Sequence, residues 1–335
     1  MTAKGRSAWP EGVLEIDDIT AARLLPERDP RGHKGTHGKL LVLAGSLEYA
    51  GAALLVARAA YRAGAGLVRL AVPESLQPLF AGRVMEATTI GLPETDVEGE
   101  VDPEAALDQL LDLDHDAAVV GPGLRPGLAT VDLVLEFLAA PGERAPAVVD
   151  AEALNSLATV DAWWERLSRP CVLTPHVGEL TKLMASAGPL FAGGVPTDLA
   201  TDDEVRIETA RRAAGAWRQA VVLKGAHSII AGAGGDASVA PFVNPALGTA
   251  GTGDVLAGTI GGLLAQGLEP EAAARLGVYL HGAAGEVLRE RLGDAGLIAS
   301  DLPEEIARVR RRLGSMRERD RAGRRLGFTV GEGGA

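Results

Sequence analysis

The sequence predicts an α/β protein with a mostly parallel central sheet and helices on both faces. Short, continuously apolar segments alternate with longer helical patterns between about residues 39 and 313. Strands that are apolar throughout, rather than at every second residue, are typical of a parallel sheet buried between two layers of helices. The expected strands are residues 40–45, 67–72, 117–120, 147–150, 171–174 and 221–223, and the first expected crossover helix is residues 52–64.

A glycine or a polar residue stands at or just after the end of most predicted strands. In chain order these residues are Gly45, Gly121, Asp150, His176 and Lys224. The carboxyl ends of parallel strands meet at one edge of the sheet, and ligands of open α/β sheets bind in the crevice there. We therefore expect these five residues to converge on one site.

The segment of residues 244–258, NPALGTAGTGDVLAG, predicts a tight turn that becomes the N-terminus of a helix. Glycines let a ligand approach the main chain, and the N–H groups of a first helical turn attract anions. Gly251, Thr252 and Gly253 are therefore expected to form an anion pocket. Asp254 at its rim is expected to be the base that deprotonates a hydroxyl group during phosphorylation. From the isolated motif, an aspartate that merely caps a buried helix is an equal alternative.

We expect one domain over residues 15–313 and a polar tail rich in arginine and glycine over residues 314–335. Residues 308–325 hold nine arginines against two acidic residues, a composition that favours a solvated helix with a frayed end over a binding tail. The segment 186–203, rich in glycine, proline and small residues, is expected to be a surface loop.

Composition and charge exclude several classes of protein. The net charge of −12 offers no basic field for a nucleic-acid backbone, so no nucleic-acid partner is expected. Residues 1–13 lack the apolar core of a signal peptide, and no apolar run reaches the roughly 18 residues needed to span a bilayer. We expect a cytoplasmic protein with no membrane partner. Its one cysteine, Cys171, falls in a predicted strand and is expected to be structural.

Ten short motifs, taken together, resemble the ADP/ATP-dependent NAD(P)H-hydrate dehydratases. The resemblance extends from about residue 24 to residue 302, and each motif alone is only moderately specific. The matching segments, in that family's order, are residues 25–28, 33–38, 44–46, 51–53, 121–124, 150–155, 173–179, 224–225, 251–254 and 279–283.

The resemblance implies a ribokinase-like fold and the repair of hydrated NADH and NADPH, whose nicotinamide ring has taken up water at C6. In that family a nucleotide phosphorylates the 6-hydroxyl group, and departure of phosphate restores the reduced cofactor. It further implies Mg²⁺, ADP or ATP as co-substrate with ADP favoured, and a homo-oligomer, many relatives being tetramers.

The resemblance also implies roles for individual residues. Asp254 would deprotonate the 6-hydroxyl group, the substrate would lie against Ala52, Gly123 and His176, and Glu179 would help to hold Mg²⁺. The residues expected to border the adenine nucleotide are Lys224, Gly225, Ala226, His227, Ser228 and Gly253.

Structural alternatives exist for several of these residues. Ala52 could be a packed helix residue, Gly123 could serve only its turn, and Lys224 could be a solvated cation. Glu179 could be a glutamate that the dipole of a helix N-terminus favours.

Two other functions use the same features. A kinase for a vitamin precursor, of the hydroxymethylpyrimidine or hydroxyethylthiazole type, would need the same anion pocket and base. A nucleotide sensor would need the pocket without a base, and the presence of Asp254 argues against it. The preferred nucleotide, the preferred hydrated cofactor and the roles of residues 186–203 and of the tail are left open.

Overall fold

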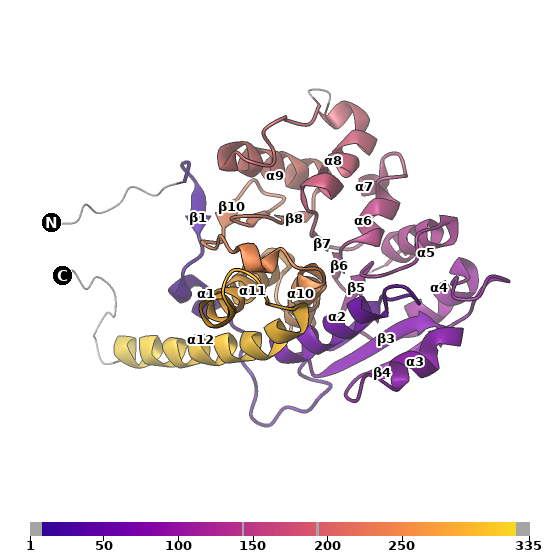
Figure 1. The fold of residues 1–335 in the computed structure, drawn as a ribbon, viewed down its shortest axis with the longest axis horizontal. Helices are drawn as coiled ribbons and strands as arrows, with labels where there is room; N and C mark the ends of the chain where they lie inside the picture. The colour runs from indigo at the N-terminus through magenta and orange to yellow at the C-terminus, as the bar shows by residue number, and fades with distance from the viewer. Residues whose placement is uncertain (1–8, 143, 192–193, 326–335) are drawn as a thin grey trace.

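A single mixed sheet forms the centre of the molecule in the computed structural model, which describes residues 9–142, 144–191 and 194–325 (Figure 1). Within these residues the strand order is β1-β10-β9-β8-β7-β6-β5-β2-β3-β4. Neighbouring strands are parallel except that β9 runs antiparallel to β8 and β10. The strands are β1 (Val13–Glu15), β2 (Lys39–Leu43), β3 (Leu67–Pro73), β4 (Thr88–Leu92), β5 (Ala117–Val120), β6 (Ala147–Val149), β7 (Cys171–Leu173), β8 (Ala220–Leu223), β9 (Ile229–Ala231) and β10 (Ala237–Val239).

Helices cover both faces of this sheet, as the continuously apolar strands predict. One face packs against α1, α2, α10, α11 and α12, and the other against α4 to α9. Strand β2 serves both cores, since Leu40 and Val42 face the first layer and Leu41 and Leu43 the second. The helices are α1 (Asp18–Leu24), α2 (Ala50–Ala63), α3 (Gln77–Ala81), α4 (Pro103–Asp112), α5 (Leu128–Ala139), α6 (Glu152–Leu157), α7 (Trp163–Arg166), α8 (Val177–Ser186), α9 (Asp203–Trp217), α10 (Thr252–Ala265), α11 (Pro270–Leu292) and α12 (Leu302–Arg325).

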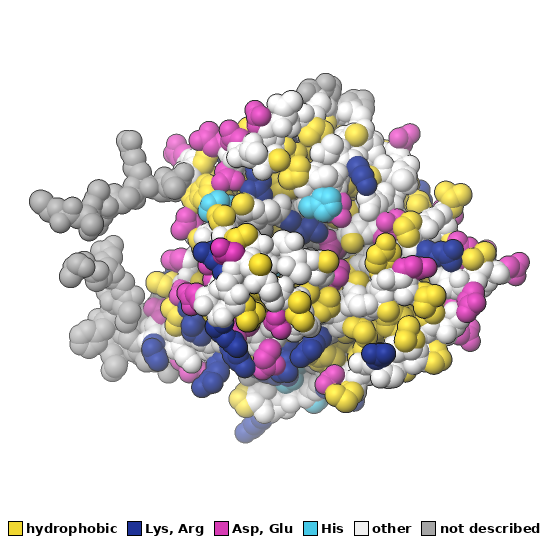
Figure 2. All heavy atoms as spheres, in the orientation of Figure 1, with side chains coloured by type: hydrophobic (Ala, Val, Ile, Leu, Met, Phe, Trp, Pro, Cys, Tyr) yellow, Lys and Arg dark blue, Asp and Glu magenta, His cyan; other side chains and the backbone are white. Residues whose placement is uncertain are grey.

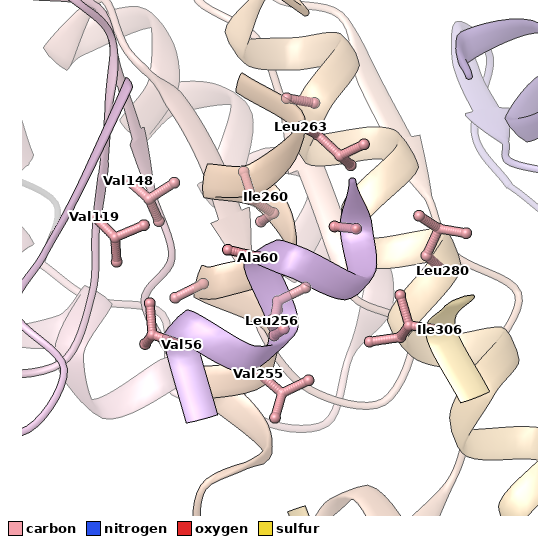
Figure 3. Close-up of a cluster of buried hydrophobic side chains, with 14 of the residues drawn as sticks. Val56, Ala60, Val119, Val148, Val255, Leu256, Ile260, Leu263, Leu280 and Ile306 are labelled. Carbon is pink, nitrogen blue, oxygen red and sulfur yellow. The ribbon is translucent and has the colours of Figure 1, made fainter. Parts of the chain in front are cut away.

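Helix α10 is held almost against the backbone of α2, which fixes the position of its N-terminus (Figure 3). A Cβ atom added to Gly258 would lie 2.3 Å from the carbonyl oxygen of Val56, and one added to Gly262 would lie 2.6 Å from that of Ala60. Glycine lets the two helices approach this closely. The apolar side chains around this contact come from α2, α10, α11, α12 and the sheet, so displacing α10 would disturb the whole core of this layer.

The six predicted strands and the first predicted helix are confirmed, and their ends agree with the prediction within two residues. The sequence interpretation missed β1, β4, β9 and β10. Three of these four are three residues long, too short for an apolar pattern to stand out. Cys171 is confirmed as a buried thiol in β7, where burial raises its pKa to about 12.

Helix α12 continues past the predicted domain end at residue 313 and reaches Arg325 without a break. The predicted tail therefore begins within a helix, while residues 326–335 lie outside the described residues, as do residues 1–8 of the N-terminal segment. The predicted loop 186–203 contains one short 3₁₀ turn, Gly188–Phe191, and residues 192–193 lie outside the description. No helix in the described part of the chain combines the length and the apolar character that a membrane crossing requires.

Candidate active site

The five strand ends singled out in the sequence do converge, because their strands are consecutive in the sheet. The order β8-β7-β6-β5-β2 places them side by side with all carboxyl ends at one edge. Backbone hydrogen bonds join the loops beyond the strands, from Gly45 N to Pro122 O at 2.8 Å and from Lys224 N to Pro175 O at 2.9 Å. The site therefore rests on connected strand ends.

The N-terminus of α10 opens at this edge without a side-chain cap. Gly251 has φ +88°, a left-handed conformation, and an added Cβ would lie 2.8 Å from Leu55 Cδ1. The N–H groups of Gly253 and Asp254 have no hydrogen-bond partner among the described residues, whereas Thr252 N donates to Thr249 O at 3.3 Å. Two of the main-chain donors in this first turn are thus available to an anion.

His281, to which the sequence interpretation gave no role, supports this turn from α11. Its Nε2 lies 2.9 Å from the carbonyl oxygen of Thr252. Burial lowers the pKa of His281 to about 4, so the ring is neutral and Nε2 must carry the proton that it donates. The residues are 29 positions apart in sequence, which explains why no local pattern could reveal the contact.

Lys224 is half-buried in a charge network and is not a solvated cation. Its Nζ donates to Asp150 Oδ1 at 2.7 Å and lies 3.7 Å from Glu179 Oε2. Burial alone would lower the pKa of Lys224, but the two carboxylates outweigh it and raise the pKa, so the ammonium group stays charged. A Cβ added to Gly253 would lie 3.7 Å from this Nζ, which places the positive charge at the mouth of the α10 N-terminus.

Asp254 is half-buried beside this network. Burial, followed by the neighbouring Asp150 carboxylate, raises the pKa of Asp254 to about 7, while Lys224 acts in the opposite direction. A carboxylate with a pKa near 7 can accept a proton at neutral pH and hold it. This distinguishes Asp254 from a solvated capping aspartate, whose pKa would be low.

A cavity of about 560 Å³ adjoins the anion pocket on the side of β8 and α11. Four of the five residues predicted at positions 224–228 line it, together with Gly253. His227 does not: its ring packs edge-on against Trp9 at 5.0 Å, and its Nδ1 lies 3.3 Å from Ala240 O. The lining residues are Lys224, Gly225, Ala226, Ser228, Ala240, Phe242, Val243, Asn244, Pro245, Leu247, Gly248, Thr252, Gly253, Leu256, Val278, His281 and Gly282.

Arg206, a buried side chain of α9, holds the loop that borders this cavity. Its guanidinium donates to the carbonyl oxygen of Ala226, lies 3.5 Å from that of Lys224, and pairs with Asp203 at 2.8 Å. The sequence interpretation missed Arg206. Its contacts cross from a helix to a distant loop, so spacing along the chain gives no sign of them.

The residues predicted to contact the substrate lie on two loops across the site. Gly123 has φ +67°, and an added Cβ would lie 2.8 Å from Ala52 Cβ, so these two residues are in contact. The side chain of His176 is 60% exposed at the start of α8, and its Nδ1 accepts a hydrogen bond from Glu179 N at 3.2 Å. The structure brings the three residues to the same sheet edge, and their contact with a substrate stays a prediction.

Glu179 caps α8, which is the structural alternative that the sequence offered. Its Oε2 accepts a hydrogen bond from His176 N at 2.8 Å, completing a capping box. Within the described residues no group of three or more acidic, histidine or cysteine side chains could hold a metal ion. Magnesium is usually held by one or two carboxylates together with substrate phosphates and water. The donor set of Glu179 and Asp150 fits that arrangement and does not form a protein-only cage.

A mostly parallel sheet with an open helix N-terminus, a half-buried lysine and an aspartate of raised pKa at its carboxyl edge defines an α/β enzyme of the ribokinase-like class. Solved structures support the fold: a ribokinase-like superfamily protein from Enterococcus faecalis has a TM-score of 0.71 at 21% identity, covering 94% of this chain and 99% of that chain. The sequence model of NAD(P)H-hydrate dehydratase matches residues 40–308, and the chain belongs to that family.

Individual relatives agree with this assignment. The chain is 43% identical over 291 residues to the bifunctional NAD(P)H-hydrate repair enzyme Nnr of Moorella thermoacetica, covering 86% of this chain and 52% of that protein. It thus spans about half the length of the bifunctional relatives. It is 36% identical to the ADP-dependent (S)-NAD(P)H-hydrate dehydratase of Xanthomonas campestris, covering 89% of this chain and 97% of that protein.

The structure of ADP/ATP-dependent NAD(P)H-hydrate dehydratase from Bacillus subtilis, co-crystallized with ATP/Mg²⁺, has a TM-score of 0.75 and 31% identity, covering 91% of this chain and 100% of that chain. A hydroxyethylthiazole kinase from Pyrococcus horikoshii shares the fold at 16% identity and a TM-score of 0.57, covering 87% of this chain and 92% of that chain. The family assignment therefore favours the dehydratase over the vitamin-precursor kinase.

Proposed function

We propose that this chain is a nucleotide-dependent (S)-NAD(P)H-hydrate dehydratase that returns hydrated NADH and NADPH to their reduced forms. The observation that carries the proposal is the placement of Asp254, with a pKa near 7, beside the open N-terminus of α10 and the charged Lys224. These groups suit proton removal from a hydroxyl group that is receiving a phosphoryl group. Membership of the dehydratase family identifies that hydroxyl group as the one at C6 of the hydrated nicotinamide.

The reaction then has two parts. Asp254 accepts the proton of the 6-hydroxyl group as its oxygen bonds to the terminal phosphorus of the nucleotide and the phosphorus–oxygen bond to the leaving nucleotide breaks. The N–H groups of Gly253 and Asp254 and the Lys224 ammonium stabilise the negative charge on the transferring group. Cleavage of the C6–O bond then releases phosphate, and loss of a proton from C5 restores the ring double bond.

The adenine nucleotide would occupy the 560 Å³ cavity, against Gly225, Ala226 and Ser228, with its phosphates toward Gly253 and Lys224. His227 would support the loop and would not contact the nucleotide, because its ring packs on Trp9 instead of lining the cavity. We favour ADP as the donor, because the relative of similar length from Xanthomonas campestris is named for ADP.

Glu179 would help to hold Mg²⁺, which would neutralise negative charge on the nucleotide phosphates. The hydrated ring would rest against Ala52, Gly123 and His176. We also propose that the protein works in the cytoplasm as a homo-oligomer, as tetramers are common among such enzymes.

Recovery of the near-ultraviolet absorbance of reduced nicotinamide tests the activity. Protein mixed with hydrated NADH and Mg²⁺ should restore this absorbance with ADP or ATP and should not restore it without nucleotide. The faster nucleotide identifies the donor. Folded protein that restores no absorbance with either nucleotide would contradict the proposal, and a stable phosphorylated vitamin precursor would indicate the kinase instead.

A further inference from the structure

A second, larger cavity runs along α2 and shares no lining residue with the 560 Å³ cavity. It measures about 770 Å³, and we call it the α2 groove. Its helical wall is a stripe of residues three or four apart along three turns of α2. Its lining residues are Gly51, Leu54, Leu55, Ala57, Arg58, Tyr61, Arg62, Arg83, Val84, Met85, Glu86 and Ser300.

The α2 groove begins where the anion pocket ends. Leu55 lines the groove, and its Cδ1 would lie 2.8 Å from a Cβ atom added to Gly251. The Cβ of Ala299 is 3.0 Å from the same position, and the next residue, Ser300, lines the groove. Gly51 adjoins Ala52, the predicted substrate contact. A molecule whose reactive end lies at Asp254 can therefore extend into the groove.

The charges of the groove suit phosphate groups. Arg58 and Arg83 are exposed and form no ion pair within the part of the chain that the structure describes, whereas Arg62 pairs with Glu304 at 2.7 Å. One acidic residue, Glu86, lines the groove, and its carbonyl oxygen accepts a hydrogen bond from the Tyr61 hydroxyl at 2.6 Å. Unpaired guanidinium groups bind phosphate oxygens through charge-assisted hydrogen bonds.

Apolar surface accompanies these cations. Met85 is 93% exposed, and Leu54, Val84 and the Tyr61 ring also face the groove. In Figure 2, dark blue Lys and Arg side chains border a yellow apolar area in the lower part of the molecule, where Figure 1 places α2 and α12. A combination of apolar surface and separate arginines matches a nucleotide, which presents a flat base and charged phosphates.

The substrate of the proposed reaction needs such a place. Only the nicotinamide end of a hydrated dinucleotide reacts, and its pyrophosphate and adenosine must lie elsewhere, because the 560 Å³ cavity would hold the phosphoryl donor. Residues 51–62 of α2 extend for roughly 16 Å at the rise of an α-helix, enough for an arm of several linked groups.

We propose that the α2 groove binds the adenosine-diphosphate arm of the hydrated dinucleotide, with Arg58 and Arg83 holding its phosphates. This rests on the proposed function for the identity of the dinucleotide. The hydrated form of NADPH carries an additional 2′-phosphate on this arm, so the cations of the groove favour it over hydrated NADH.

Binding and kinetics of the double variant Arg58→Gln/Arg83→Gln test the proposal. The affinity for NADPH, the product that carries the same arm, is measured by titration and needs no turnover. We expect it to fall at least tenfold, because each lost charge-assisted hydrogen bond is worth a factor of about ten or more. The KM for hydrated NADPH should rise by a similar factor, while kcat and the KM for ADP or ATP stay close to wild type.

The matched control is Arg311→Gln/Arg319→Gln, which removes two exposed arginines of α12 that do not line the groove. It should bind NADPH as the wild type does. Circular dichroism checks folding, and the single variants Arg58→Gln and Arg83→Gln repeat the test with less perturbation.

The outcomes separate the two proposals. Unchanged NADPH affinity and unchanged KM in the groove variants would overturn the groove assignment while leaving the dehydratase intact. A change in sedimentation without a change in affinity would also overturn it and would indicate a contact between copies of the chain. An inactive wild type whose NADPH affinity still falls in the groove variants would reject the proposed function and retain the groove as a dinucleotide site.

Discussion

Among the helices that begin at the active edge of the sheet, α8 and α10 have N-termini that differ in one respect: the first is capped by side chains and the second is not. At α8, the His176 side chain accepts a hydrogen bond from Glu179 N, and the Glu179 side chain accepts one from His176 N. At α10, Gly251 supplies no side chain, and the N–H groups of Gly253 and Asp254 have no partner among the described residues.

The difference indicates how the same property of a helix N-terminus can stabilise the fold at α8 and, in the proposed function, bind a ligand at α10. The first turn of any α-helix has main-chain donors without partners inside the helix, and it carries the positive end of the helix dipole. The α8 end uses its own glutamate as the anion and is closed. The α10 end has no such cap, and in the proposed function it binds an anion from outside. Lys224 lies near both ends, 3.7 Å from Glu179 Oε2 and 3.7 Å from the Cβ position of Gly253.

The largest effect is expected from Asp254→Asn at the open helix. Asparagine cannot accept the proton, so kcat should fall roughly a thousandfold. Nucleotide affinity should be retained, since the donors and the cavity are unchanged. Single-turnover kinetics and a nucleotide titration measure the two quantities. A variant with near wild-type turnover would refute the role of Asp254 as the base.

The second-largest effect is expected from Gly253→Ala, which adds a methyl group at the open N-terminus of α10. The Cβ of Gly253→Ala would lie 3.7 Å from Lys224 Nζ, in the space that the transferring phosphate would fill. We expect kcat/KM to fall roughly a hundredfold, as when a transition-state donor is lost. Thermal unfolding should show little loss of stability, because alanine is the better helix residue. Comparable loss of folding and activity would mean that Gly253 is needed for structure alone.

Stability should change in the opposite direction from activity in Asp254→Asn. The pKa of this carboxyl rises from 3.8 to about 7 on folding, so the folded chain binds the proton more tightly and stability is lost as pH rises between these values. The asparagine side chain does not ionise, so the variant does not lose this stability as pH rises. We expect the variant to be more stable at pH 8 by about 1–2 kcal/mol, a figure reduced for solvent access.

The stability difference should shrink as pH falls from 7 and vanish below about pH 3, where the aspartate is protonated in both the folded and the unfolded chain. Denaturant unfolding of the variant and the wild type at the two pH values measures it. Equal stability at pH 8 would show that Asp254 is not held at a raised pKa.

Two substitutions of Glu179 test the capped N-terminus of α8. Glu179→Gln keeps an oxygen that can accept from His176 N, so the capping box and the stability should survive. Glu179→Ala removes it and should cost about 1 kcal/mol of unfolding free energy. If Glu179 also holds Mg²⁺, both variants should need more Mg²⁺ for half-maximal rate. Equal Mg²⁺ dependence in all three proteins would leave Glu179 a capping residue alone.

The smallest expected effect is on the pH profile. The base must be unprotonated, so the rate should rise as pH increases through about 7. Asp150→Asn removes the carboxylate that helps to raise the pKa of Asp254 and leaves Lys224 nearby, so the midpoint should move to lower pH. A midpoint that stays in place would show that burial alone sets the pKa of Asp254.

The parts of this comparison that lie within short segments could be predicted from sequence. The glycine-rich turn predicted the open α10 end, and residues at strand ends predicted the edge where they meet. The spacing of His176 and Glu179 could also have indicated a capping box, although histidine is not a usual N-cap residue. What escaped prediction joins distant segments: the His281 contact with Thr252, the Arg206 support of Ala226, and the α2 groove, whose walls come from three parts of the chain.

The most direct test of the account follows one oxygen atom. Hydrated NADH carrying heavy oxygen in its 6-hydroxyl group is turned over with nucleotide, and the products are analysed by mass spectrometry. If the nucleotide phosphorylates that hydroxyl group before elimination, with Asp254 as the base, the heavy oxygen must appear in the released phosphate. Heavy oxygen found in water, with ordinary phosphate, would mean that the hydroxyl group leaves without being phosphorylated and would contradict the account.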